Sequence, residues 1–149
     1  MSKTVEWGID LGTTNSAIAR MTQKGPEIIQ VNRQNYIPSA VAFDKRGDIK
    51  VGNDALNLHL SSARGFKRLM GTQQMLALGE EQWSPERLSA EILKALRAAA
   101  YRRTNEEIED VVITVPAMFL QPQCAATLEA AKLAGLNAVV LLQEPIAAA

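Results

Sequence analysis

The chain has 149 residues, of which 47% are hydrophobic and 21% are charged, as expected of one soluble globular domain. Sixteen basic and sixteen acidic residues cancel, which argues against nucleic acid or a membrane surface as a partner. The single cysteine, Cys124, excludes an internal disulfide and fits a reducing compartment. No apolar signal core follows Met1 and no stretch approaches the ~18 apolar residues of a membrane span, so we expect a cytoplasmic protein.

The first half of the chain predicts short strands and short helices. Turn residues at 11–14 and at Gly25-Pro26 separate three short segments, which predicts an antiparallel meander. Residues 71–84 show no clear periodicity and are expected to form a loop or a short cap. The predicted strands are 5–10, 15–21, 27–31, 40–43 and 49–51, and the predicted short helices are 53–60 and 64–70.

The second half predicts a long helix and a βαβ unit. The helix over 85–103 has Ser84 as its cap and an apolar stripe along one face, and its charged face is expected to be solvated. The continuous apolar run at 111–115 is typical of a strand buried on both faces. A helix over 122–134 and a strand over 138–142 follow, and such short connections predict a parallel pair of strands.

The last residues, 144–149, resemble the first turn of a helix. A helix needs ~12–15 residues, or packing against other elements, before it is stable. We therefore expect the sequence to be one part of a longer protein.

The segment Asp10 to Ser16 is the first candidate site. A turn rich in glycine and threonine presents backbone N–H groups and hydroxyls toward one point, which favours a bound phosphate. Asp10 could hold Mg²⁺ through water, because this ion gives up its hydration shell reluctantly. The alternative is an ordinary hairpin turn in which the aspartate is satisfied by its neighbours.

Further candidates lie at strand ends and on the segment around Lys67. If the first strand runs parallel to the two buried strands, Asp10, Pro116 and Glu144 share one edge of the sheet. Glu144 could then orient a water that attacks a phosphate, or it could be a carboxylate favoured at a helix start. Lys67 could reach the β- and γ-phosphates, or it could be a solvated helix lysine.

His59 and Cys124 complete the set of side chains that carry possible chemistry. His59 has no partner at the spacing of a metal site or a catalytic triad, so we expect it at the surface. Cys124 lies among alanines and is expected to be packed rather than reactive.

Four segments together resemble the DnaK-type, 70 kDa heat-shock chaperone family. They are 8–16, similar to its first phosphate loop; 66–71, similar to the segment with its catalytic lysine; 111–117; and 134–136 with 144–149. The resemblance implies an actin-like (ribonuclease H-like) ATPase fold, with this chain as lobe I. Its mixed sheet would combine an antiparallel meander with a parallel βαβ unit and carry helices on both faces. Residues 1–36 and 110–149 would form a core subdomain, and about 37–109 a reduced upper subdomain with its connecting helix.

The resemblance also implies an activity and its residues. The chain would be the N-terminal part of an ATP-dependent molecular chaperone that hydrolyses ATP to ADP and phosphate and controls the binding of unfolded polypeptide. A J-domain co-chaperone and a nucleotide-exchange factor would be further partners, and this part alone is expected to be inactive. The implied residues are Asp10, Gly12, Thr13, Thr14 and Asn15 for nucleotide, Asp10 for Mg²⁺ through water, Lys67 and Glu144 for catalysis, and Pro116 as a switch.

Several positions depart from the family pattern. Met118 replaces a common tyrosine, and Cys124 stands where an arginine normally works with the switch proline, which puts allosteric coupling in doubt. Val140 falls near a basic position that helps to hold the J-domain partner. The short 71–84 segment resembles the bacterial HscC-like branch. Two alternatives are a regulatory or interaction module on the same fold, and another actin-like ATPase or kinase.

Overall fold

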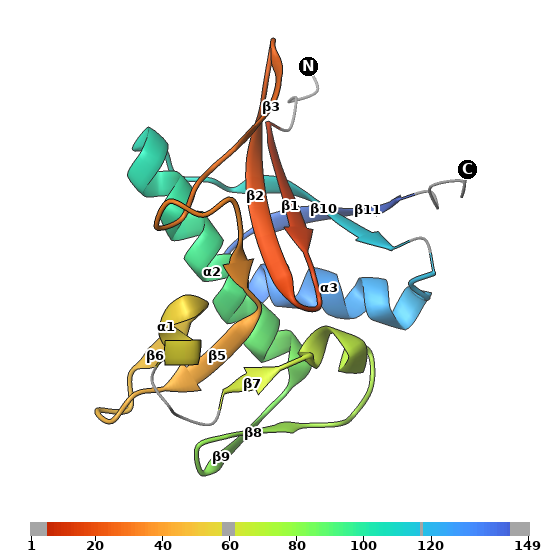
Figure 1. Cartoon of the computed structure of the whole chain (residues 1–149). Coiled ribbons are helices and arrows are strands. Elements are labelled where there is room, and N and C mark those ends of the chain that lie inside the picture. The colour runs from red at the N-terminus through yellow and green to blue at the C-terminus, as the bar shows by residue number, and fades with distance from the viewer. Residues whose placement is uncertain (1–5, 58–61, 117, 144–149) are drawn as a thin grey trace, which may run out of the picture.

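The computed structural model describes residues 6–57, 62–116 and 118–143 (Figure 1). They form a mixed α/β fold with one main sheet and two small ones. The main sheet contains β1 (Trp7–Leu11), β2 (Asn15–Thr22), β3 (Gly25–Ile28), β4 (Ile37–Pro38), β10 (Asp110–Pro116) and β11 (Asn137–Gln143). The small sheets contain β5 (Ala40–Phe43), β6 (Ile49–Val51) and β7 (Ala63–Arg64), and β8 (Leu76–Leu78) with β9 (Glu81–Trp83). The helices are α1 (Asn53–Asn57), the 3₁₀ helix η1 (Phe66–Leu69), α2 (Pro85–Thr104) and α3 (Gln121–Leu133).

The main sheet joins an antiparallel meander to a parallel βαβ unit, as predicted. Its strand order is β11-β10-β1-β2-β3, and β4 pairs with β2. β1 runs parallel to β10, with Gly8 beside Val112, and β10 runs parallel to β11 through the α3 crossover. The carboxyl ends of β1, β10 and β11 therefore lie at one edge of the sheet.

Both long helices pack against the same face of this sheet. Ile9 and Ile113, on that face, are buried in one core cluster with residues of α2 and α3. On the opposite face Asp10 is exposed, and the side chain of Val139 in β11 is 60% exposed. The expectation of helices on both faces is therefore wrong for the described residues, because the side chains of only one face join the helical core.

The long helix α2 has residues at both ends that favour helix termini. The Ser84 hydroxyl accepts a hydrogen bond from the Arg87 amide at 3.1 Å, and Pro85 occupies the first turn. Asn105 ends the helix in a left-handed conformation with φ of 59°. Its buried stripe includes Leu88, Ile92, Leu93 and Leu96, all fully buried. No helix among the described residues combines the length and the apolarity needed to cross a membrane.

The segment between α1 and α2 differs from the prediction. Residues 64–70 are not a regular helix but the end of β7 and the 3₁₀ helix η1, which begins after Gly65 with φ of +68°. Residues 71–84 are not a loop throughout, because they contain the β8–β9 hairpin. The predicted helix over 53–60 is confirmed as far as Asn57, and residues 58–61, His59 among them, lie outside the described residues.

Candidate phosphate-binding site

A three-residue loop, Gly12 to Thr14, joins β1 to β2 and turns the chain sharply. A Cβ atom placed on Gly12 would overlap the carbonyl oxygen of Asn15, so only glycine fits this position. Neither the Thr13 amide nor the Thr14 amide donates a hydrogen bond to another residue in the described part of the chain. Backbone N–H groups left unpaired on such a loop form a concavity that suits an anion.

Two buried serines hold this loop in place. The Ser39 hydroxyl donates to the Gly12 carbonyl oxygen at 2.8 Å and lies 2.8 Å from the Ser16 hydroxyl. The Ser39 amide donates to the Thr14 carbonyl oxygen at 2.8 Å, and the Gly12 amide donates to the Ser16 hydroxyl at 3.2 Å. Sequence analysis missed Ser39, because nothing in its local pattern reveals that β4 brings it against β2.

Asp10 lies at the carboxyl end of β1, on the open face of the sheet. It is exposed, and Thr114 of the neighbouring strand β10 is its register partner. The described residues hold no group of three or more His, Cys, Asp or Glu side chains that could bind a metal ion. Asp10 therefore fits Mg²⁺ only as a single carboxylate, with water and a phosphate ligand completing the coordination.

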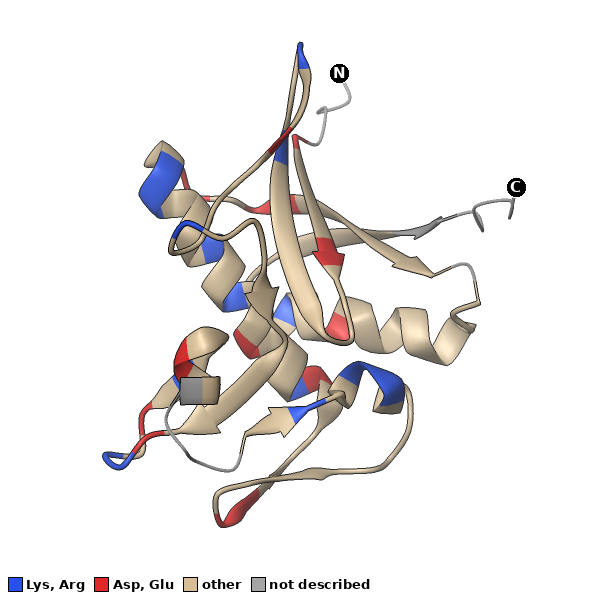
Figure 2. Cartoon of the chain, in the orientation of Figure 1, with Lys and Arg blue, Asp and Glu red and all other residues tan. Residues whose placement is uncertain are grey.

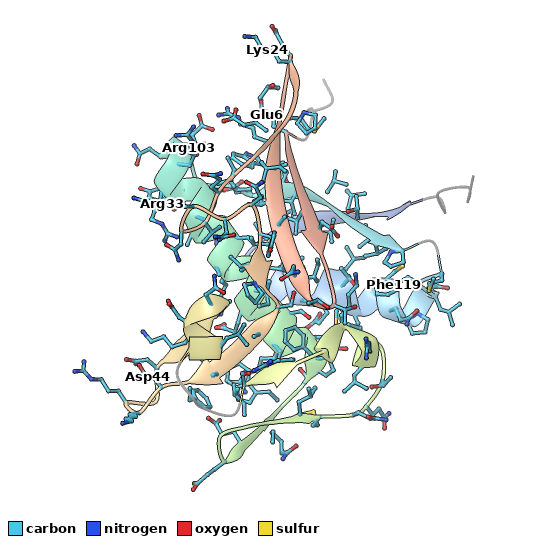
Figure 3. All side chains as sticks on the ribbon, in the orientation of Figure 1. Glu6, Lys24, Arg33, Asp44, Arg103 and Phe119 are labelled. Atoms are coloured by element: carbon cyan, nitrogen blue, oxygen red, sulfur yellow. The ribbon has the colours of Figure 1, made fainter. Side chains whose placement is uncertain are left out.

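Lys67 is buried, so the alternative that it is a solvated helix lysine is wrong. Only 8% of the residue is exposed, and its Nζ lies 5.3 Å from the centre of the Phe119 ring. Burial lowers the pKa of Lys67 from its usual range, and the negative charge of Asp10 partly offsets this effect. Figure 3 labels Phe119, in the connection between β10 and α3. The structure therefore places Lys67 against Phe119, within reach of the charge of Asp10.

The segment that carries Lys67 is fixed at its far end by close packing. Gly71 has φ of +80°, and a Cβ atom on it would lie 2.9 Å from the carbonyl carbon of Pro122 at the start of α3. The Gly71 amide also points to the Glu86 carboxylate, at 3.4 Å. This close approach requires glycine and holds the chain after η1 against the start of α3.

The remaining predicted residues lie along the same sheet edge or outside the described residues. Pro116 is the half-buried last residue of β10, in register with Gln143 of β11. Glu144 directly follows β11 but lies outside the described residues. The side chain of Met118 is 83% exposed, whereas Cys124 is partly buried and packs against the core, as predicted.

Comparison with known proteins identifies the family. The family model described as Hsp70 protein matches residues 6–76 and 72–149. The chaperone protein DnaK of Mycoplasmopsis agalactiae is 39% identical over 153 residues, covering 100% of this chain and 25% of that protein. The DnaK proteins of Mycoplasmopsis pulmonis and Mycoplasma mobile match with the same identity and coverage.

Two facts about these matches bear on the expectations above. The chain spans about a quarter of the length of the curated relatives that it matches. The matches run over 153 residues, four more than the chain's 149, so these DnaK proteins have no long insertion at residues 71–84. A short segment there does not separate the chain from them, and the HscC-like branch stays a prediction. Across its whole length, the chain belongs to the Hsp70 family.

Proposed function

We propose that this chain is the N-terminal part of the ATPase domain of an ATP-dependent chaperone. The observation that carries the proposal is the buried Lys67, which the charge of Asp10 reaches. Asp10 lies near the end of β1, shortly before the loop of Thr13 and Thr14. A buried cation near a loop with free amides suits a ligand that brings several negative charges. The parent protein would bind ATP and hydrolyse it to ADP and phosphate.

Each residue of the site has a role in this proposal. The tight turn at Gly12, with the backbone of Thr13, Thr14 and Asn15, would hold the phosphates, and the two threonine hydroxyls would add donors. Lys67 would stabilise charge on the γ-phosphoryl group. Mg²⁺, held by Asp10 through water, would neutralise charge on the phosphate oxygens.

Two further residues would link the chemistry to the rest of the parent protein. Glu144 would position the attacking water at the sheet edge where β1, β10 and β11 end. Pro116 would act as a switch between nucleotide state and peptide affinity. Unfolded polypeptides are the proposed clients, with a J-domain co-chaperone and a nucleotide-exchange factor as further partners and the cytoplasm as the location.

The proposal extends to the architecture. The chain would form lobe I of an actin-like ATPase fold. Residues 1–36 and 110–149 would be its core subdomain, and about 37–109 its reduced upper subdomain with the connecting helix. Except for β4, which lies at the boundary, every strand of the main sheet falls in the core ranges and every strand of the two small sheets falls in 37–109, which supports this division.

Single-turnover ATP hydrolysis by the full-length protein tests the proposal. We expect Lys67→Ala and Glu144→Ala each to abolish slow hydrolysis without loss of nucleotide binding. Lys94→Ala, which removes an exposed lysine on α2, serves as the control and should retain the wild-type rate. Hydrolysis that is indifferent to both substitutions would refute the assigned roles.

The regulatory module remains a second candidate, favoured by the exposed Met118 and by the lack of a guanidinium at Cys124. It predicts that the full-length protein binds ATP without hydrolysing it. The same single-turnover experiment, with nucleotide binding measured in parallel, separates the two functions.

A further inference from the structure

Two glycines in the left-handed region flank the short helix that carries Lys67. Gly65 precedes η1 with φ of +68°, and Gly71 lies shortly after it with φ of +80°. Because glycine adopts this region without a steric penalty, these residues set the directions in which the chain enters and leaves η1. Their surroundings differ. A Cβ atom on Gly65 would meet nothing within 4 Å in the described part of the chain, whereas one on Gly71 would lie 2.9 Å from the Pro122 carbonyl carbon.

The contact at Gly71 is made with backbone atoms of a helix. A Cβ atom there would also lie 3.0 Å from the Pro122 carbonyl oxygen and 3.1 Å from the Gln123 nitrogen. These atoms belong to the first turn of α3, where the Gln123 side chain accepts a hydrogen bond from the Leu120 amide at 2.6 Å. Close-packed backbone transmits a displacement instead of absorbing it. The chain after η1 is therefore held against a fixed surface.

The helix α2 holds the same end of the segment. The Ser89 hydroxyl donates to the Met70 Sδ at 3.5 Å inside the core, and Met70 is fully buried. The Gly71 amide points to the Glu86 carboxylate, 3.4 Å away. Figure 2 shows η1, with its basic residues in blue, beside the first turns of α2. Residues 70 and 71 are thus held by α2 and by α3.

Lys67 contacts the chain close to the same point of α3. Its Nζ lies 5.3 Å from the centre of the Phe119 ring, and the Phe119 amide donates to the Pro116 carbonyl oxygen at 3.0 Å. Phe119 and Pro122 are close in sequence, where the chain passes from β10 into α3. The η1 segment therefore contacts one short stretch of chain twice, with its cation at Phe119 and with its end at Pro122.

We propose that Gly71 is a positioning residue for Lys67: it holds the end of η1 against α3 and so keeps the ammonium group buried at the Phe119 ring. Because η1 has only four residues, a shift at Gly71 moves Lys67 as well. A misplacement of about 1 Å at a catalytic group can cost about a hundredfold in rate. The effect on hydrolysis rests on the proposed function of Lys67, but the placement of Lys67 can be measured without nucleotide.

The ionisation of Lys67 in the 149-residue chain tests this placement. Burial lowers the pKa of Lys67 in the wild type, and Gly71→Ala should push η1 away from α3, expose the ammonium group and raise this pKa towards its usual range. The lysine Cε resonances, followed by ¹³C NMR across pH, report the pKa, and comparison with Lys67→Met assigns the Lys67 signal. Gly65→Ala is the matched control, because it places the same side chain at a similar φ without a close contact, and it should leave the pKa unchanged.

Single-turnover hydrolysis by the full-length protein tests the consequence for the reaction. Gly71→Ala should slow hydrolysis by about tenfold to a hundredfold, while nucleotide affinity changes by less than about threefold. Gly65→Ala should stay near the wild-type rate. If urea denaturation shows that Gly71→Ala does not fold, Gln123→Ala takes its place. This variant removes the hydrogen bond to the Leu120 amide at the start of α3 and should shift the pKa of Lys67 in the same direction by a smaller amount.

Two results would overturn the inference. One is an unchanged pKa of Lys67 in the folded Gly71→Ala or Gln123→Ala variant, and the other is an equal rise in Gly65→Ala. A raised pKa in Gly71→Ala with no change in hydrolysis would support the placement and refute the catalytic role of Lys67. The inference and the proposed function therefore fail separately.

Discussion

The burial of the Lys67 charge lowers the stability of the folded chain, and a role in binding or catalysis would explain why a lysine is found there. A lysine with 8% exposure keeps its charge poorly solvated, and the direction of its pKa change reports this penalty. Among the described residues, the Phe119 ring and the charge of Asp10 compensate for it. Residues that cost stability in the unliganded protein are frequent at functional sites.

Lys67→Met is expected to stabilise the chain. Methionine keeps the apolar stem and removes the buried charge, so the free energy of unfolding near pH 7 should rise by about 0.5–2 kcal/mol, the range common for stabilising substitutions. Urea denaturation of the two proteins measures the difference. A lower stability of the variant would show that the ammonium group is stabilised in the folded chain.

The pH dependence of this difference has a definite sign. Because the pKa of Lys67 is lower in the folded chain than in the unfolded chain, the folded chain binds fewer protons between these two values. Wild-type stability should therefore rise relative to Lys67→Met as the pH increases through that window. Below the folded-state pKa the gap between the two proteins should be constant.

Phe119 is expected to position Lys67 through its ring. Phe119→Leu keeps an apolar side chain but removes the ring face, whose attraction for a cation is worth about 0.5–2 kcal/mol. Single-turnover hydrolysis by the full-length protein should slow by about threefold to tenfold, while nucleotide affinity changes less. Phe119→Tyr keeps the ring and should retain the wild-type rate; equal rates for the leucine and tyrosine variants would contradict the role.

At the scale of elements, the geometry of the Gly12–Thr14 loop depends on β4. This strand has only two residues, yet Ser39 directly after it supplies two hydrogen bonds to the loop. The loop residues alone therefore do not determine the geometry of the site.

Ser39→Ala is expected to loosen the phosphate loop. It leaves the Gly12 carbonyl oxygen and the buried Ser16 hydroxyl without this partner, which should cost about 1–2 kcal/mol of stability and reduce nucleotide affinity. Thr104→Ala is the control: it removes a hydroxyl at the end of α2 that donates to the Ala100 carbonyl oxygen and accepts from the Glu106 amide. It should lower stability without any effect on nucleotide binding. Isothermal titration calorimetry and urea denaturation of both variants separate the two effects.

The elements that could be predicted are those with long, regular patterns. The stripe of α2 and the apolar run of β10 extend over enough residues to show their period, and short connections then require the parallel pairing. The strands β8 and β9 have three residues each, which is too short for a period. Gly79, with a positive φ of 62°, lies in the turn of this hairpin. A glycine at this place in the sequence could have indicated the turn.

The candidate site was predictable in part for the same reason. Asp10 and the Gly12–Thr14 turn lie in one continuous segment, so their proximity follows from local sequence. The burial of Lys67 depends on Phe119, and the anchoring of the loop depends on Ser39, both distant in sequence. Contacts of this kind are set by tertiary packing, which no local pattern reveals.

At the scale of the molecule, α2 connects the two parts of the fold. Its buried stripe contributes to the core under the main sheet, and it also packs against β5, β6 and η1 (Figure 1). The segment with Lys67 is thus attached to a helix that also packs against β2 and α3.

The proposed site residues that the structure describes would reach a bound phosphate from this one chain. Asp10, the Thr13–Thr14 loop and Lys67 would supply donors and charge, while the face of the sheet on which Asp10 lies carries no helix in the described residues. Stabilising a phosphoryl transition state needs groups arranged around the developing charge, and removing even one donor can cost a hundredfold or more, ~10²–10³.

We therefore expect the 149-residue chain by itself to hydrolyse Mg·ATP far more slowly than the proposed full-length protein. Single-turnover assays of both, at equal concentrations and with Lys67→Ala versions as blanks, measure this difference. A rate for the chain alone that equals the full-length rate and depends on Lys67 would contradict the expectation. That result would mean that these residues, with Glu144, form a complete catalytic site, and the proposed second lobe would then serve regulation rather than chemistry.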